Sequence, residues 1–347
     1  MKTKITESFS IKYPIFMSGM SWISVPKMVA AVSNAGGVGI LATGPLTAEQ
    51  TRSAVREIRS LTDKPFGANA TLYFPGADEN AKVLLEERVP IINFALGKGD
   101  WIVNAAHKYG GKVIATVVNA KHGTRAQDYG CDAVIATSYE AAAHGEVVAG
   151  MVLIPHLVDA LNIPVIAAGG IGDGRGLAAA LTLGAEGIAM GTRFMTTKES
   201  PLHSRYKEFS LQKDVTDTLY SPRIDGLPCR VLDTDAARNA ERKGFNPFVA
   251  MINSYSIAKN MRLPYFKVFF SVLGQGYKSM KQLAHMALAF ESFQKATEEG
   301  DINMGVLPVG QVMGLMRDEP TVAVLLERIV REAKQQQIRS AEIFSEY

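Results

Sequence analysis

The sequence contains very little cysteine and no long apolar run. Cys131 and Cys229 are the two cysteines among 347 residues, and they are too far apart to form a CxxC pair. This argues against a disulfide framework and against a structural zinc site, and it favours a reducing compartment. No apolar run reaches the ~18 residues of a membrane span. The N-terminal stretch MKTKITESFSIKYP lacks the apolar region of a signal peptide, so we expect a cytoplasmic protein without a membrane span.

The net charge of the chain is also small. The formal net charge is +3, aromatic residues make up 8% of the chain and charged residues 20%. The charge is spread along the sequence, which argues against a nucleic-acid partner. With 47% hydrophobic residues, the composition is typical of an enzyme with a large core, built as one α/β barrel or as two domains.

The most informative stretch runs from Pro164 to Phe194. Two short apolar segments each end in a glycine-bearing loop, Gly169-Gly170 and Gly191-Thr192, with an Ala/Leu-rich helix between them. Backbone without side chains lets N–H groups approach an anion, so the pair of loops favours a phosphate site. The alternative is that these glycines form only tight turns. The spacing does not fit G-x-G-x-x-G, which disfavours a dinucleotide site and favours a mononucleotide or phosphosugar.

Short apolar strands alternate with helices through the first two hundred residues. Eight strands are predicted: Ile15–Met17, Val38–Leu41, Phe66–Asn69, Ile91–Phe94, Val113–Val117, Ala133–Ala136, Val165–Ala168 and Gly187–Met190. Each is followed by a helical pattern or by a glycine loop, and Thr47 is predicted to cap one helix. Eight such units indicate a (β/α)8 TIM barrel rather than an open sheet. The glycine loops then follow the seventh and eighth strands, where such barrels commonly bind phosphate.

The pattern changes after Phe194. Residues 201–302 have few strand signals and several helical stretches, and the segment 245–277 is rich in aromatic residues. We predict a helical lid or substrate domain over residues 201–302, inserted between two parts of the barrel, 1–200 and 303–347. Whether the aromatic residues form a lid, a dimer surface or plain core stays open.

His144 follows the sixth strand in the sequence YEAAAHGEVVAG. A histidine in a loop on the catalytic face of a barrel can act as a base or as a hydrogen-bond donor near neutral pH. The alternative is a histidine whose hydrogen bonds are made by the loop backbone. The other histidines do not cluster or show a metal-ligand spacing, so no metal site is predicted.

Polar groups and a glycine at other strand ends are further candidates for ligand contacts. Asn69 ends the third strand, Thr116 lies late in the fifth, and Gly19-Met20 follow the first. These residues could meet a ligand ring, and ordinary turn chemistry explains them equally well.

The chain resembles the nitronate monooxygenase family, formerly called 2-nitropropane dioxygenases. Its flavin-dependent relatives include an NADH:quinone reductase and enoyl-acyl-carrier-protein reductases. The resemblance is carried by the following stretches: YPIFMSGMSW, VSNAGGVGIL, TDKPFGANATL, EAAAHGE, IPVIAAGGIGDGRGLAAALTLGAEGIAMGTRF and VGQVMGL. The family's histidine loop commonly reads EAGGHxG, and here Ala142 and Ala143 replace its two glycines.

The resemblance implies an FMN-bearing barrel with a helical lid and with His144 as the active-site histidine. It places the FMN phosphate on Gly169, Gly170, Gly191 and Thr192, and the flavin ring near Gly19, Met20, Asn69 and Thr116. It also assigns Gln311 to the same pocket.

For function, the resemblance implies oxidation of alkyl nitronates by O2 through a flavin semiquinone, with a homodimer left open. The alternatives are an NAD(P)H-dependent FMN reductase of a quinone or enoyl thioester, and an FMN- or phosphosugar-binding barrel without turnover.

Overall fold

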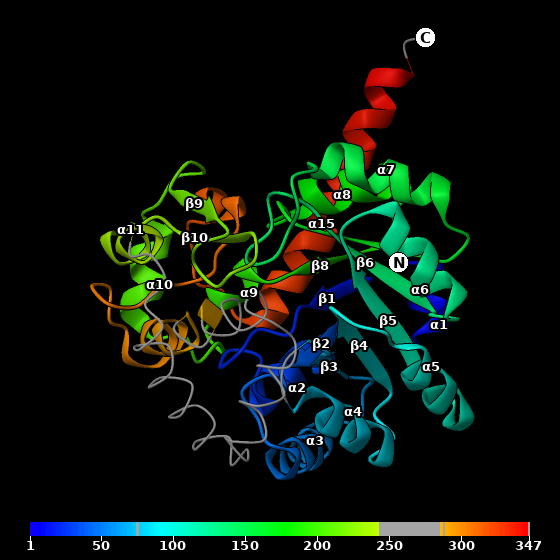
Figure 1. Ribbon diagram of the computed structural model, residues 1–347. Helices are drawn as coiled ribbons and strands as arrows, with labels where there is room; N and C mark the ends of the chain where they lie inside the picture. The colour runs from blue at the N-terminus through cyan, green and yellow to red at the C-terminus, as the bar shows by residue number, and fades with distance from the viewer. Residues whose placement is uncertain (74–75, 243–284, 287–288, 346–347) are drawn as a thin grey trace.

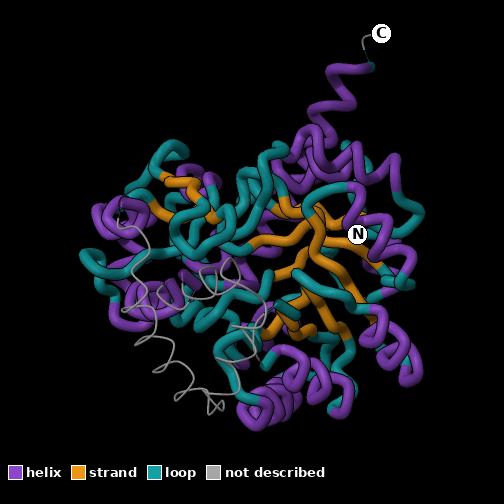
Figure 2. The backbone as a smooth tube through the Cα atoms, in the orientation of Figure 1, coloured by secondary structure: helices purple, strands orange, loops and turns teal. Residues whose placement is uncertain are grey.

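A computed structural model describes residues 1–73, 76–242, 285–286 and 289–345. Eight parallel strands form a closed barrel in the order β1 to β8, with β8 paired to β1 through Ile15 and Ile188 (Figures 1 and 2). The strands are β1 Ile15–Met17, β2 Val38–Leu41, β3 Gly67–Thr71, β4 Ile91–Ala95, β5 Lys112–Val117, β6 Ala133–Thr137, β7 Val165–Ala168 and β8 Gly187–Met190. The predicted (β/α)8 barrel is confirmed.

Helices precede, connect and follow the strands of the barrel. They are α1 Lys4–Ser8, α2 Pro26–Asn34, α3 Ala48–Leu61, α4 Ala77–Glu86, α5 Asp100–Ala106 with a 3₁₀ turn His107–Tyr109, α6 Ala120–Asp128, α7 Gly150–Ala160, α8 Gly174–Thr182 and α9 Thr192–Met195. The predicted cap at Thr47 is confirmed, because its hydroxyl accepts from the Gln50 N–H at 3.2 Å and the Gln50 side chain accepts from the Thr47 N–H at 2.9 Å. This reciprocal pair satisfies two N–H groups of the first turn of α3.

The N-terminal end of the barrel is closed by apolar side chains. Ile5 and Phe9, from α1 and the residue after it, are buried, and the Phe9 ring meets the Phe16 ring edge-on at 6.0 Å. They belong to one buried cluster with inward-facing strand residues such as Ile40 and Ile166. Because this end is filled, the opposite end, where the strands finish, is the one available for a ligand.

The described part of the segment after β8 contains helices, together with a hairpin that the sequence did not predict. Its described elements are α10 Ser204–Leu211, β9 Thr218–Ser221, β10 Cys229–Leu232, α11 Asp235–Arg242 and a π-helical turn Lys295–Glu299. Strands β9 and β10 pair antiparallel, with Arg230 opposite Tyr220. The hairpin escaped prediction because both strands are short and carry polar residues in place of an apolar run. The aromatic-rich segment 245–277 lies outside the described residues.

The last elements return to the barrel. A 3₁₀ turn, Gln311–Leu315, precedes α15, Val322–Phe344, which packs along α8 and continues past it (Figure 1). The sequence pattern predicts a closing helix over Thr321–Lys334, and the observed helix runs ten residues further, to Phe344. The apolar periodicity stops after Ala333, whereas the following residues are strong helix formers without glycine or proline, so the helix continues without a buried face. None of the helices in the described ranges is long and apolar enough to cross a bilayer.

Candidate active site

A pocket of about 850 Å³ lies where the barrel strands end, between the barrel and the segment after β8. Residues at the end of each strand, or in the loop that follows it, contribute to its wall, together with Asp225 and Leu227 from the β9–β10 turn. The predicted site residues that line it are His144, Gly19, Met20, Asn69, Thr116, Gly169, Gly170, Gly191 and Thr192. The structure therefore brings together side chains and loops that the sequence separates by more than a hundred residues.

The two glycine loops offer backbone donors to this pocket. Gly169 and Gly170 have φ angles of +109° and +70°, a region that favours glycine. The N–H groups of Gly169, Gly170 and Gly191 donate to no acceptor among the described residues. Unpaired N–H groups on adjacent loops at a strand-to-helix junction fit a bound phosphate, since an anion would satisfy all of them.

Close packing behind the first loop explains why it lacks side chains. A Cβ atom on Gly169 would lie 2.2 Å from the Ser138 hydroxyl oxygen. That hydroxyl donates to the carbonyl of Ala168 at 3.1 Å and is buried. The β6 and β7 loops therefore touch at this point, and glycine is the residue that permits the contact.

The second glycine loop, Gly191-Thr192, is hydrogen-bonded to the C-terminal segment. The Thr192 hydroxyl accepts from the Gly310 N–H at 2.9 Å and is buried, which leaves its own O–H available as a donor. Gln311 is not among the residues that line the pocket, although its neighbours Gly310 and Val312 are. Its backbone N–H donates to the Glu140 carbonyl at 3.0 Å, so the structure places Gln311 against the histidine loop.

On the opposite wall, polar side chains at the strand ends are fixed by hydrogen bonds. The Asn69 side-chain oxygen accepts from the Thr43 N–H at 2.9 Å, and Gly19 leaves room for the Asn69 amide, which a Cβ would approach to 2.7 Å. The Asn93 amide donates to the Thr116 hydroxyl at 3.0 Å and to the Ile114 carbonyl at 3.1 Å. Sequence analysis missed Asn93, although an amide inside the apolar run IINFA was a usable signal of a buried polar contact.

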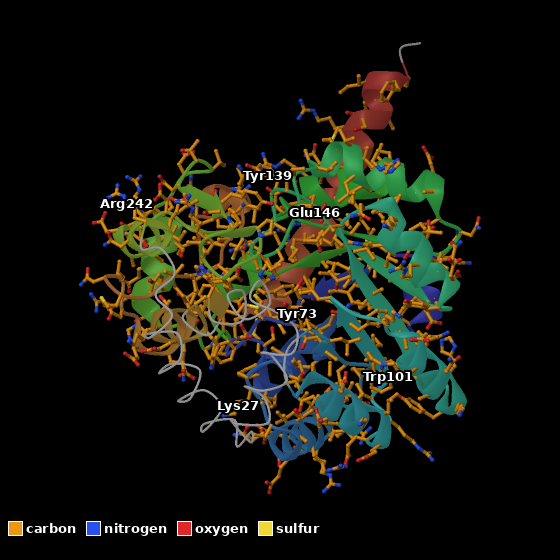
Figure 3. All side chains as sticks on the ribbon, viewed as in Figure 1. Lys27, Tyr73, Trp101, Tyr139, Glu146 and Arg242 are labelled. Carbon is orange, nitrogen blue, oxygen red and sulfur yellow. The ribbon has the colours of Figure 1, made fainter. Side chains whose placement is uncertain are left out.

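The histidine loop is held by the β9–β10 hairpin. Ala143 and Arg230 exchange two backbone hydrogen bonds, of 3.1 and 2.9 Å, and the Tyr220 hydroxyl donates to the Gly145 carbonyl at 2.9 Å. Tyr139 and Glu146, which flank the loop, lie at the boundary between the barrel and the hairpin segment (Figure 3). The loop conformation is thus set from both sides, by the barrel and by the β9–β10 hairpin.

Arg230 is a buried cation in this hairpin, at 2% exposure. Its guanidinium donates twice to the Tyr139 carbonyl, at 3.1 and 3.0 Å, and once to the Thr218 hydroxyl at 2.8 Å. It also lies over the Tyr139 and Tyr220 rings, 4.4 and 5.2 Å from their centres. Carbonyl dipoles and ring faces stabilise the charge here, so Arg230 anchors the loop to the hairpin.

His144 itself meets a carboxylate from the hairpin turn. Its Nε2 atom lies 2.6 Å from Oδ2 of Asp225, a residue that is 4% exposed. Cys229 is next to this pair, with donor atoms of all three residues within 4.8 Å of one another. Burial, together with the neighbouring Asp225 carboxylate, raises the pKa of the Cys229 thiol well above its usual value, so the thiol is neutral near pH 7. Asp225 lies 81 residues from His144, and nothing in the sequence pattern pointed to it.

The arrangement can bind an anion and exchange a proton within one pocket. Donors for a phosphate lie on the β7 and β8 loops, and an ionisable imidazole lies on the β6 loop beside them. Such a pairing suits a phosphate-bearing cofactor whose reactive part extends across the strand ends towards His144.

Comparison with known proteins agrees with this architecture. The chain matches the nitronate monooxygenase family over residues 2–83 and 76–332. A relative in Rhodococcus jostii (strain RHA1), named (3aS,4S,5R,7aS)-5-hydroxy-7a-methyl-1-oxo-octahydro-1H-indene-4-carboxyl-CoA dehydrogenase, is 37% identical over 96% of each chain. A probable nitronate monooxygenase of Staphylococcus saprophyticus is 30% identical over 68% of this chain and 79% of its own.

Among solved structures, FabK from Thermotoga maritima is 35% identical, with a TM-score of 0.84 over 99% of each chain. The sequence match, the closed barrel and the two glycine loops agree with one another, so we conclude that the chain belongs to the nitronate monooxygenase family and is an oxidoreductase.

Proposed function

We propose that the protein is an FMN-dependent oxidoreductase that transfers hydride and proton at the acyl part of a CoA thioester. The observation that carries the proposal is the shared pocket. The His144 imidazole and the N–H groups of two glycine loops, which meet no acceptor in the described part of the chain, line the same cavity. A phosphate-bearing redox cofactor and an acid–base group are the two components that such a reaction needs.

The residues present fit FMN. Gly169, Gly170, Gly191 and Thr192 would hold its phosphate with backbone and hydroxyl donors. Gly19, Met20, Asn69 and Thr116 would line its ring, and the missing side chain at Gly19 leaves room for the Asn69 amide, which a Cβ at position 19 would approach to 2.7 Å. When bound, FMN supplies the acceptor or donor of the hydride.

His144 would handle the proton. A dehydrogenation removes two electrons and two hydrogens from the substrate, one hydrogen as hydride and the other as a proton. His144 takes that proton, and in the reverse direction it returns the proton to the product. A nicotinamide coenzyme is then the second substrate, which removes or delivers the hydride in the other half of the cycle.

Two observations support a CoA thioester as the substrate: a relative that aligns over almost the whole chain, and positive charge at the mouth of the pocket. The Rhodococcus jostii protein named as a CoA dehydrogenase aligns over 96% of this chain, whereas the probable nitronate monooxygenase aligns over 68%. Lys98 and Arg125 line the pocket, are exposed and have no acidic partner among the described residues. Unpaired cations at a pocket mouth suit the phosphates of CoA.

Oxidation of a nitronate by O2 is the second candidate, and the family match over almost the whole chain favours it. His144 would then abstract the proton of a neutral nitroalkane or bind the oxygens of the nitronate. This substrate carries no phosphate and gives no role to Lys98 and Arg125.

Anaerobic mixing of the FMN-loaded protein with each substrate separates the candidates. We expect the bicyclic hydroxyacyl-CoA that names the Rhodococcus relative to bleach the visible flavin absorbance, and the free acid to fail. Bleaching by NADH or NADPH that crotonyl-CoA reverses would also support a thioester reaction. Turnover of propyl-2-nitronate with O2, without any response to thioesters, would establish the second candidate instead. No response to any of these compounds would indicate a binding barrel without turnover, and a protein that binds no added FMN would overturn the flavin assignment.

Reversing charge at the pocket mouth tests the thioester separately. In the double variant Lys98→Glu, Arg125→Glu, KM for the acyl-CoA is expected to rise about tenfold, and more at low salt, since exposed charges are screened by ions. KM for propyl-2-nitronate should stay unchanged. An equal effect on both compounds would show that these cations do not recognise CoA.

A further inference from the structure

Asp225 is a buried carboxylate that none of the cofactor contacts requires. It lies in the β9–β10 turn, just before Gly226, and its side chain is 6% exposed. Oδ1 accepts from the Leu227 N–H at 3.1 Å, and Oδ2 meets His144 Nε2 at 2.6 Å. No lysine or arginine forms an ion pair with it among the described residues. Its ionisable hydrogen-bond partners there are the predicted catalytic histidine and the neutral Cys229 thiol.

The pair is held rigidly on both sides. The Arg230–Ala143 backbone bridge and the Tyr220–Gly145 hydrogen bond join the hairpin to the residues that flank His144. Ala143 is held at a φ of +54°, which an alanine adopts only where the surroundings impose it. The hairpin therefore contributes, through Asp225, the contact that sets the direction of the imidazole.

An ionised carboxylate only accepts hydrogen bonds, so the imidazole nitrogen that faces it carries a proton. Nε2 faces Asp225, and Nδ1 has no partner among the described residues. We propose that Asp225 is a positioning residue that fixes His144 as the Nε2–H tautomer and leaves Nδ1 as the atom that exchanges the proton with substrate. The proton exchange with substrate rests on the function proposed above, whereas the assignment of the Nε2–H tautomer is independent of it.

The nearby Cys229 raises the alternative of a metal ion shared by the three residues. Donor atoms around a tetrahedral zinc ion are about 3.3 Å apart, as follows from metal–ligand distances of about 2.0 Å. The 2.6 Å separation between His144 and Asp225 is instead that of a charge-assisted hydrogen bond. The geometry therefore favours a proton between the two groups.

The tautomer can be measured directly in the FMN-loaded full-length protein labelled with ¹⁵N-histidine. Two-bond ¹H–¹⁵N correlation distinguishes a protonated from a bare ring nitrogen, and the His144 signals are identified by their loss in His144→Gln. We expect a protonated Nε2 and a bare Nδ1 in the wild type. In Asp225→Asn the amide can donate as well as accept, so we expect a mixture of both tautomers. A bare Nε2 in the wild type, or an unchanged spectrum in Asp225→Asn, would overturn the proposal.

Kinetics provide the second readout. Asp225→Asn should lower kcat for the acyl-CoA about 100- to 1,000-fold, the lower part of the range that acid–base catalysis contributes, with KM altered less than about threefold. Asp233→Asn is the matched control: its carboxylate pairs with Arg238 at the surface, 2.7 Å away, and does not line the pocket. An unchanged kcat in Asp225→Asn would overturn the positioning role. Absence of acyl-CoA turnover in the wild type would refute the proposed function instead, and the spectrum would still decide the tautomer.

Discussion

Replacing Gly169 by alanine is expected to abolish FMN binding and to destabilise the protein. The new Cβ would lie 2.2 Å from the Ser138 hydroxyl and would hold a side chain at a φ of +109°. Relieving the overlap moves the loop away from the position in which its N–H groups meet a phosphate. We expect the Kd for FMN to rise at least about 100-fold, and the free energy of unfolding to fall by about 2–5 kcal/mol from overpacking and backbone strain together. Titration with FMN followed by visible absorbance, and thermal unfolding of the cofactor-free protein, measure the two effects.

Gly110→Ala is the matched control. Gly110 also has a positive φ, of +80°, but a Cβ there would meet nothing within 4 Å. In this control the free energy of unfolding should fall by about 1–2 kcal/mol because of backbone strain, and the Kd for FMN should stay unchanged. Adding Ser138→Ala to Gly169→Ala removes the nearest atom and should restore part of the binding. Normal FMN affinity in Gly169→Ala alone would contradict the phosphate site on this loop.

The barrel could be predicted from the sequence because its signals are local. Four strands, for example Val165–Ala168, begin and end at the predicted residues, and the other four differ by one or two residues. Most strands are short apolar runs, and several helices carry their own start or stop signal, such as the Thr47 cap. At the end of α15 the apolar periodicity of the sequence predicts only the part of the helix that has a buried face, and the helix continues beyond it.

The site residues that could be predicted are those that differ clearly from the sequence around them. Glycines at Gly169, Gly170 and Gly191 stand out against apolar strands, and His144 stands out in a run of alanines. Asp225 did not stand out, because its role depends on a hairpin turn meeting a distant loop through a single hydrogen bond. Such contacts between distant segments have no periodicity, so pattern reasoning does not reach them.

Replacing His144 by glutamine is expected to stop proton exchange while the pocket stays intact. The amide keeps the approximate size and polarity of the ring but accepts no proton near pH 7. With the acyl-CoA as substrate, kcat should fall at least about 1,000-fold, and the Kd for FMN should change less than about threefold because no glycine loop is touched. His156→Gln, on the exposed side of α7 and away from the pocket, is the control and should behave as the wild type.

The role of His144 as a base can also be tested by comparing a nitroalkane with its nitronate. The two compounds differ by the one proton that His144 would take. If His144 is the base, His144→Gln loses turnover of the neutral nitroalkane far more than turnover of the nitronate, which arrives already deprotonated. Steady-state O2 consumption with each compound measures the ratio. Equal losses on both would mean that His144 binds the substrate and does not move its proton; Asp225 would then orient a hydrogen-bond donor.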